Sequence, residues 1–265
     1  MSTRVVVITG GGTGIGAAVA RQAAASGWQV VITGRRAEVL ASVAAETGAL
    51  AIAADMADED QVNSAVAQVI EQFGRIDGVV ANAGIMRVGD VVSTSVDDWN
   101  ETLNVNLNGP FLVARATLPH LLESRGAFVA VSSIASLRVT PGSAAYSVSK
   151  AGLTMLTMTL ARDFARQGVR ANVVSPGWVR TEMADGEMVE FGCAYGLSVD
   201  EAYAEVTALV PAGRAADPSE VANAVLWLLG PESSYVNGAT LVVDGGTILG
   251  DPGTVPFEVH LEPRG

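Results

Sequence analysis

The sequence contains only one cysteine and two histidines among its 265 residues. Because a lone Cys193 cannot form an internal disulfide and fits a reducing compartment, we expect the protein to be cytoplasmic. His120 and His260 are far apart and have no cysteine nearby, so we expect no metal site. No apolar run approaches the ~18 residues that a membrane span needs. The first strand is expected to start near Val5, which leaves no room for a signal peptide.

Basic residues are scarce relative to acidic ones. The 28 Asp and Glu residues against 16 Lys and Arg give a net charge of −12, and the sequence pI is about 4.5. This charge repels nucleic acid and anionic membrane surfaces, so we expect neither as a partner. Lysine is nearly missing, since Lys150 is the only one and every other basic side chain is an arginine.

Short apolar runs alternate with longer helical patterns along the whole chain. The predicted strands are Val5–Thr9, Gln29–Thr33, Leu50–Ala53, Gly78–Ala81, Ala127–Val131, Arg170–Val174 and Ala239–Val243, and the predicted helices include Gly14–Ala25, Glu59–Phe73, Val96–Leu122 and Ala145–Arg166. Continuous apolar strands need helices on both faces of their sheet, and this alternation is typical of βαβ units. We therefore predict an α/β fold with a Rossmann-type, doubly wound parallel sheet of about seven strands, in a single domain over residues 1–265.

Two segments depart from this alternation. Ser175–Asp217 is a long insertion with its own apolar residues, which is typical of a substrate-binding lid. Its cysteine, Cys193, has no basic residue nearby, so we interpret it as a packing residue and not as a nucleophile. Thr247–Gly265 forms a C-terminal tail, and our hypothesis is that it reaches a neighbouring subunit.

The first predicted strand runs into TGGGTGIG, which opens the first predicted helix. A dinucleotide needs a tight turn here, a close approach of the backbone to the pyrophosphate, and a helix N-terminus directed at its negative charge. Gly10, Gly14 and Gly16 meet these needs at the first strand–helix junction, so the segment predicts dinucleotide binding, with a purely structural turn as the alternative.

The end of the second strand suggests which dinucleotide binds. An acidic residue there would bind the ribose 2′-hydroxyl of NAD(H), but the sequence has Gly34 followed by Arg35 and Arg36. Because guanidinium groups suit a phosphate dianion, we expect NADP(H) to be preferred, with NAD(H) as the alternative. Neutral Thr13 offers no additional cation, and the two arginines could instead be solvated residues at the start of a helix.

The only lysine belongs to YSVSK, four residues after Tyr146. At this spacing both side chains lie on the same face of a helix. A phenol with its ordinary pKa near 10 exchanges protons poorly at neutral pH, and a close cation lowers that pKa. The pair is therefore typical of acid–base chemistry by Tyr146, assisted by Lys150.

With these motifs the chain resembles the short-chain dehydrogenase/reductase family, in its branch of single-domain enzymes of about 250 residues. The resemblance runs from about Val5 to Gly246 and rests on TGGGTGIG, Asp55 in AADMAD, NAG at Asn82–Gly84, Asn106 in NVNL, SS at Ser132–Ser133, YSVSK, PGWVRT and VDGG. It implies that Tyr146 is the general acid or base, that Ser133 holds the substrate oxygen, and that Lys150 binds the nicotinamide ribose. By the same resemblance, Asn106 holds a water that relays protons to this lysine.

The cofactor-binding residues follow from the turn, the second strand and the resemblance together. They are Gly10, Thr13, Gly14, Ile15, Gly16, Arg35, Arg36, Asp55, Met56, Asn82, Ala83, Gly84, Tyr146, Lys150, Pro176, Gly177, Val179 and Thr181. The predicted substrate pocket adds Met86, Leu137, Trp178, Met183, Met188 and Phe191 to Ser133, with Val88, Val139 and Tyr195 in the same loops.

This apolar set favours a hydrophobic ketone or secondary alcohol as substrate, interconverted by hydride transfer. One alternative is a 3-oxoacyl-[acyl-carrier-protein] reductase, which the net charge disfavours, although Arg125, Arg166 and Arg170 could form a local basic patch for an acidic carrier. Another alternative is a cofactor-sensing binding protein without catalysis. Halohydrin dehalogenases differ in having arginine in place of the lysine and in lacking the glycine turn. The family resemblance also implies a homotetramer.

Overall fold

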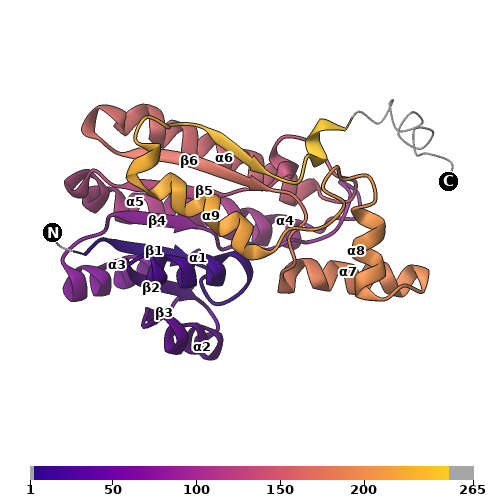
Figure 1. Cartoon of the computed structure of the whole chain (residues 1–265), viewed down its shortest axis with the longest axis horizontal. Helices are drawn as coiled ribbons and strands as arrows, with labels where there is room; N and C mark the ends of the chain where they lie inside the picture. Colours follow the sequence, from indigo (N-terminus) through magenta and orange to yellow (C-terminus); the bar gives the residue numbers. More distant parts are fainter. Residues whose placement is uncertain (1–2, 251–265) are drawn as a thin grey trace.

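The computed structural model describes residues 3–250, which form one parallel sheet with helices on both faces (Figure 1). The seven strands are β1 (Val5–Thr9), β2 (Gln29–Gly34), β3 (Leu50–Ala53), β4 (Gly78–Ala81), β5 (Ala127–Val131), β6 (Arg170–Pro176) and β7 (Thr240–Val243). Their order in the sheet is β3-β2-β1-β4-β5-β6-β7. The predicted fold class is confirmed, and only the boundaries of β2, β6 and β7 differ, by one or two residues.

Successive strand residues point to opposite faces, and a separate set of helices covers each face. Val6 and Ile8 of β1 pack under α1 (Gly14–Ala25), α2 (Ala37–Thr47) and α9 (Pro218–Leu229). Val5 and Val7 pack under the helices of the other face, which are α3 (Glu59–Phe73), α5 (Gly109–Ser124) and α6 (Ala144–Phe164). This two-sided burial explains why the strands are continuously apolar in sequence.

The strand order reverses between β1 and β4, which are neighbours in the sheet although two strands separate them in the chain. From β1 the chain first moves outward to β2 and β3, and it then returns to β4 before moving outward the other way. The loops after β1 and β4 therefore diverge and leave a crevice at the carboxyl ends of these strands, which is where open α/β sheets bind ligands.

The single helix expected over Val96–Leu122 is wrong, because a π-helical turn at Asn104–Asn108 separates α4 (Val96–Leu103) from α5. Pro110 supplies a physical reason for the interruption. In a continuous α-helix its N–H would bond to the carbonyl four residues earlier, that of Asn106, but proline has no N–H. Such π turns often occur at functional sites, and this one places Asn106 at its centre.

The predicted lid contains two helices, α7 (Glu182–Tyr195) and α8 (Val199–Val206). They pack around a small apolar cluster of their own, formed by Ala184, Met188, Ala202 and Tyr203 and separate from the clusters on the two faces of the sheet. Cys193 is exposed on α7, so the interpretation of this cysteine as a packing residue is wrong. Of the predicted tail, residues 251–265 lie outside the described part of the chain.

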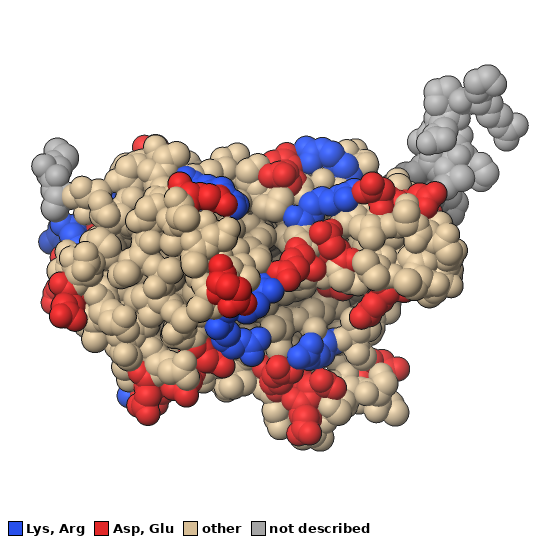
Figure 2. Space-filling view, turned by 90° about the horizontal axis from the view of Figure 1, so that it is seen from below, with Lys and Arg blue, Asp and Glu red and all other residues tan. Residues whose placement is uncertain are grey.

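Acidic and basic side chains are interspersed on the face shown in Figure 2, where both kinds surround a recess. Within residues 3–250, no helix is long and apolar enough to cross a membrane. The same residues contain no group of three or more His, Cys, Asp or Glu side chains placed to hold a metal ion.

Candidate active site

The turn between β1 and α1 has the backbone geometry that a bound pyrophosphate requires. Gly10 and Gly14 have φ angles of 64° and 52°, which favour glycine because a Cβ is strained there. Gly16 lies so close to the carbonyl oxygen of Gly10 that any side chain would collide with it, and its Cβ would also come within 2.6 Å of Nδ2 of Asn82. The turn is therefore closed by backbone contacts that only these glycines allow.

Asn82, directly after β4, fixes this turn. Its Nδ2 donates to the carbonyl oxygens of Thr9 at 3.0 Å and Gly10 at 3.1 Å. In return, Oγ1 of Thr9 accepts hydrogen bonds from the backbone N–H groups of Asn82 and Ala83, each at 3.0 Å. The family resemblance implies that Asn82 contacts the adenosine side of a cofactor, but its amide donors are used to join the two strands at the reversal point.

The N-terminus of α1 fits an anionic ligand. Thr13, its N-cap residue, makes no side-chain capping bond, and the first turn holds no acidic residue. Within residues 3–250, the first N–H groups of α1, at the positive end of the helix dipole, therefore face the crevice without a side-chain partner. Together with the glycine cradle, this arrangement fits the pyrophosphate of a dinucleotide.

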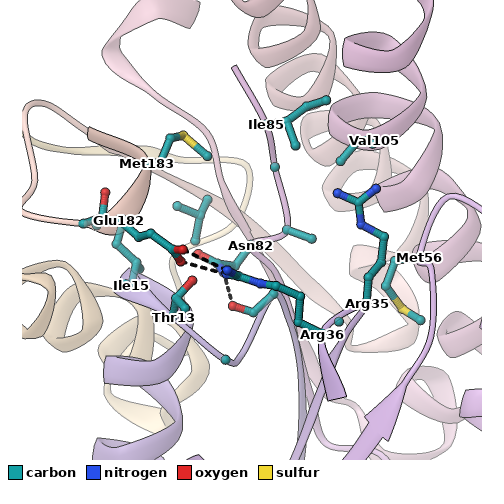
Figure 3. A pocket seen from close by; sticks show the side chains of 18 of the residues that line it. Thr13, Ile15, Arg35, Arg36, Met56, Asn82, Ile85, Val105, Glu182 and Met183 are labelled. Atoms are coloured by element: carbon teal, nitrogen blue, oxygen red, sulfur yellow. Dashed lines mark hydrogen bonds and ion pairs between the residues drawn. The ribbon is translucent and has the colours of Figure 1, made fainter. Parts of the chain in front are cut away.

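Two arginines follow β2 at the edge of the crevice and point in different directions (Figure 3). Arg36 makes two hydrogen bonds to Glu182, at 2.8 and 2.7 Å. Arg35 lines the same crevice, and within residues 3–250 it forms no hydrogen bond or ion pair. The two adjacent arginines are therefore not equivalent, a difference that the sequence does not show.

A crevice of about 300 Å³ runs from the arginines to Tyr146 and Lys150. Among the predicted cofactor-binding residues, those that line it are Gly10, Thr13, Gly14, Ile15, Arg35, Arg36, Asp55, Met56, Asn82, Ala83, Gly84, Tyr146, Lys150 and Thr181. Those that do not line it are Gly16, Pro176, Gly177 and Val179. Sequence reasoning missed Val39, Leu40, Ile85, Val105, Val131 and Glu182. Ile85, Val105 and Val131 adjoin or belong to the NAG, NVNL and SS motifs, which could have pointed to them. Val39, Leu40 and Glu182 lie on α2 and α7, where the local sequence gives no such signal.

At the inner end of the crevice, α6 carries Tyr146 and Lys150 on one face. The Lys150 side chain is buried, and its Nζ donates to the carbonyl oxygen of Val131 at 3.0 Å and lies 5.6 Å from the centre of the Tyr146 ring. Ser133, after β5, is hydrogen-bonded to the Tyr146 side chain. A Cβ on Gly84 would lie 3.3 Å from the lysine ammonium, so this glycine brings the loop after β4 close to the same charge.

Burial controls the protonation of this pair. It raises the pKa of Tyr146 to about 12, although the hydrogen bond with Ser133 acts in the opposite direction. Burial also lowers the pKa of Lys150 to about 8. The direction for Tyr146 is opposite to the lowering that the YSVSK spacing suggests, because burial is the largest contribution to this pKa and Lys150 is not among its causes.

Asn106 lies behind Lys150 and is completely buried. Its Oδ1 accepts from the N–H of Ile85 at 2.8 Å, and its Nδ2 donates to the carbonyl of Ile85 at 2.8 Å and to Oγ of Ser149 at 3.0 Å. Both side-chain donors are thus engaged in holding the loop after β4 against α6. Pro110 has no N–H to donate to the backbone carbonyl of Asn106, so this carbonyl makes no ordinary α-helical hydrogen bond.

Comparison with known proteins identifies the family to which this site belongs. The family model described as enoyl-(acyl carrier protein) reductase matches residues 10–247, nearly the whole described chain. The chain belongs to the short-chain dehydrogenase/reductase family. Its members include dehydrogenases and reductases, so this short-chain dehydrogenase/reductase is an oxidoreductase of the same type.

Three relatives show how far the similarity extends. Protein MoaE of Klebsiella aerogenes is 43% identical over 256 residues, which cover 96% of this chain and 99% of the relative. The 2-(R)-hydroxypropyl-CoM dehydrogenase of Xanthobacter autotrophicus is 38% identical over 253 residues, covering 92% and 98%. The structure of a variant actinorhodin polyketide ketoreductase with NADPH has a TM-score of 0.88 and 32% identity, covering 93% and 98%.

The predicted substrate-pocket residues of this short-chain dehydrogenase/reductase do not form one apolar wall. Met188 is buried in the cluster of the lid, and Trp178 and Phe191 pack against that cluster. Met183 lines the crevice. Leu137, Val88, Val139 and Tyr195 are exposed. The lid therefore uses much of the predicted apolar set for its own packing.

The suggested basic patch lies at the wrong end of the sheet to serve the active site. Arg125 precedes β5 and Arg170 begins β6, so both are at the amino ends of parallel strands, whereas Tyr146 lies near the carboxyl ends. Arg170 also donates hydrogen bonds to the carbonyls of Leu228 and Gly230, at 2.8 and 3.1 Å. An acidic carrier protein bound to these arginines would not deliver its substrate to Tyr146.

Proposed function

We propose that the chain is an NADP(H)-preferring carbonyl reductase or alcohol dehydrogenase, which interconverts a hydrophobic ketone and its secondary alcohol. The observation that carries this proposal is one crevice lined by Tyr146 and Lys150 at its inner end and, at its outer end, by an Arg35 that has no ion-pair partner within residues 3–250. Ser133 does not line this crevice but lies against Tyr146. The whole chain would act as a single catalytic domain, with residues 175–217 covering the substrate.

The side chains have distinct roles in the proposed reaction. The nicotinamide of a bound cofactor supplies or accepts the hydride. Ser133 donates a hydrogen bond to the substrate oxygen and orients the carbonyl, while Tyr146 transfers the proton to or from the same oxygen. Lys150, held by Val131, places a positive charge at the ribose and phenol. Asn106 braces this lysine and offers a backbone carbonyl to a water that returns protons.

The protonation of the free site favours reduction as the starting direction. A Tyr146 with a pKa of about 12 keeps its proton at neutral pH and is ready to donate it to a carbonyl oxygen. Because Lys150 has a pKa of about 8, it is mostly charged at neutral pH. It loses this charge as the pH rises through that value, which removes its support for a phenolate in the oxidation direction.

Replacing Tyr146 by Phe tests the mechanism. The change deletes the proton donor and leaves the glycine turn and Arg35 untouched, so kcat should fall by about 100-fold or more while the Kd for NADPH stays within about twofold. Turnover should be followed by the absorbance of the reduced nicotinamide, with ketones, alcohols and a β-ketoacyl thioester as substrates. Near-wild-type turnover in this variant would refute the role of Tyr146.

Two further outcomes separate the alternatives. If the β-ketoacyl thioester alone were reduced, the chain would be a 3-oxoacyl-[acyl-carrier-protein] reductase. Tight cofactor binding without turnover of any substrate would indicate a cofactor-sensing protein.

We also propose a cytoplasmic homotetramer, supported by the single exposed Cys193 and by apolar side chains exposed on α5 and α6, namely Phe111, Val148 and Met155.

A further inference from the structure

The pair formed by Arg36 and Glu182 joins two segments that are 146 residues apart in the chain. Arg36 is the N-cap residue of α2, on the body of the protein, and Glu182 is the first residue of α7, in the lid. Both guanidinium contacts, at 2.8 and 2.7 Å, reach the two carboxylate oxygens, which is the bidentate geometry that holds orientation best. Figure 3 shows this pair spanning the crevice above Thr13.

Apart from this pair, the helices of the lid (residues 175–217) make few polar side-chain contacts with the rest of the protein. The helices α7 and α8 pack around their own cluster, and Arg180–Asp200 and Tyr203–Asp185 tie the lid to itself. Across residues 3–250, no second ion pair or side-chain hydrogen bond links α7 or α8 to the chain outside the lid. Glu182 is therefore the polar anchor of these helices on the body.

The anchor lies directly over the place where a pyrophosphate would bind. Thr181, which precedes Glu182, approaches the glycine turn so closely that a Cβ on Gly14 would lie 3.0 Å from its methyl carbon. Arg35, in contrast, points away from Glu182 toward the side of the crevice where Val105 lies (Figure 3). Thus one arginine is committed to the lid and the other is open to a ligand.

We propose that Arg36 and Glu182 are positioning residues that hold the lid over the bound dinucleotide, and that Arg35 alone recognises a 2′-phosphate. This inference rests on the proposed function in that the crevice must bind NADP(H) or NAD(H). The pair acts on the pyrophosphate side, which both cofactors share, so it retains both equally. The discrimination between them belongs to Arg35.

A competing arrangement predicts the opposite change in the affinity for NADPH when the Glu182 carboxylate is removed. If Arg36 were a phosphate ligand, Glu182 would compete with the phosphate for it, and removing the carboxylate would strengthen NADPH binding selectively. With the lid anchored by the pair, removing the carboxylate instead speeds the release of both cofactors. Exposed ion pairs contribute modestly, so we expect release to be about two- to fivefold faster.

The experiment is stopped-flow displacement of NADPH and of NADH from the full chain, with Kd values from fluorescence titration. Glu182→Gln should raise both dissociation rates by the same factor and leave the ratio of the two Kd values unchanged. The double variant Arg36→Gln/Glu182→Gln keeps the wild-type net charge and should release both cofactors no faster than Glu182→Gln alone. Glu46→Gln is the matched control, because it breaks the similarly exposed pair with Arg21 outside the crevice and should change nothing.

The inference is overturned if Glu182→Gln lowers the Kd for NADPH relative to NADH, or if it leaves both release rates at the wild-type value. Circular dichroism of each variant confirms that the fold is kept. Failure of the proposed function looks different, since the wild-type chain itself would then bind neither dinucleotide, or would bind them and turn over no ketone or alcohol.

Discussion

The burial of Glu187 in the lid predicts a pH-dependent effect of this residue on stability. Glu187 lies on α7 one turn after Met183, is half-buried, and within residues 3–250 accepts no hydrogen bond. Burial, and secondarily repulsion by Glu190, raise its pKa from an ordinary 4.5 to about 7. Its charge also contributes to the raised pKa of Tyr146, so the carboxylate lies within electrostatic reach of the phenol.

The amount by which the Glu187 carboxylate lowers the free energy of unfolding depends on pH. In the unfolded chain Glu187 loses its proton near its ordinary pKa, and in the folded chain it does so near pH 7, so stability falls as the pH rises between these values. At ~1.4 kcal/mol per pKa unit the difference amounts to about 3 kcal/mol, and solvent screening of a partly exposed group reduces it to about 1–2 kcal/mol. Glu187→Gln should be more stable than the wild type by this amount at about pH 8, and equally stable at about pH 4.

Urea denaturation followed by tryptophan fluorescence, at the two pH values, measures this difference. Glu190→Gln on the same helix is the matched control, and because that residue is exposed it should gain much less. A second readout is the rate of alcohol oxidation, which rises with pH as Tyr146 ionises. Removing the charge near Tyr146 lowers its pKa, so this rise should occur at lower pH. An equal stability difference at both pH values, or none, would show that the carboxyl is not desolvated as described.

Two other expectations can be checked directly. Arg35→Ala should raise the Kd for NADPH about tenfold or more and change that for NADH less than twofold, because only the 2′-phosphate loses a charge-assisted partner; isothermal titration calorimetry measures both, and equal losses would remove the basis for NADP(H) preference. Light scattering should give the mass of a tetramer for the wild type, and Phe111→Glu should shift it toward smaller species, since a charge would be placed on an exposed apolar side chain of α5. A monomeric wild type would contradict the tetramer.

The sheet was predictable because its inner strands are buried on both faces and are therefore continuously apolar. The runs before Gly10 and Asn82 could therefore be placed as strands, whereas the strand order and its reversal point were established by the structure. The α4–α5 interruption could have been predicted as well, because Pro110 removes the donor for the Asn106 carbonyl. The pattern of apolar residues hid it, since a π turn changes the phase of a helix and not its composition.

The pairing of Arg36 and the environment of Lys150 could not be predicted from the sequence. Two adjacent arginines look alike until the fold brings Glu182, from a distant segment, to only one of them. In the same way, the YSVSK spacing places Lys150 near Tyr146 but says nothing of the Val131 carbonyl that takes its hydrogen bond. Long-range partners of this kind depend on tertiary packing, which local spacing does not encode.

The hydrogen bonds by which Asn82 fixes the glycine turn have a consequence for the entropy of ligand binding. These hydrogen bonds to the carbonyls of Thr9 and Gly10 hold the glycine turn in shape through β1 and β4, whether or not a phosphate is present. Ordering a flexible loop would cost about 1–2 kcal/mol per residue, and a turn that is already rigid avoids that loss. The pyrophosphate end of the crevice therefore needs little ordering of its backbone when a dinucleotide binds.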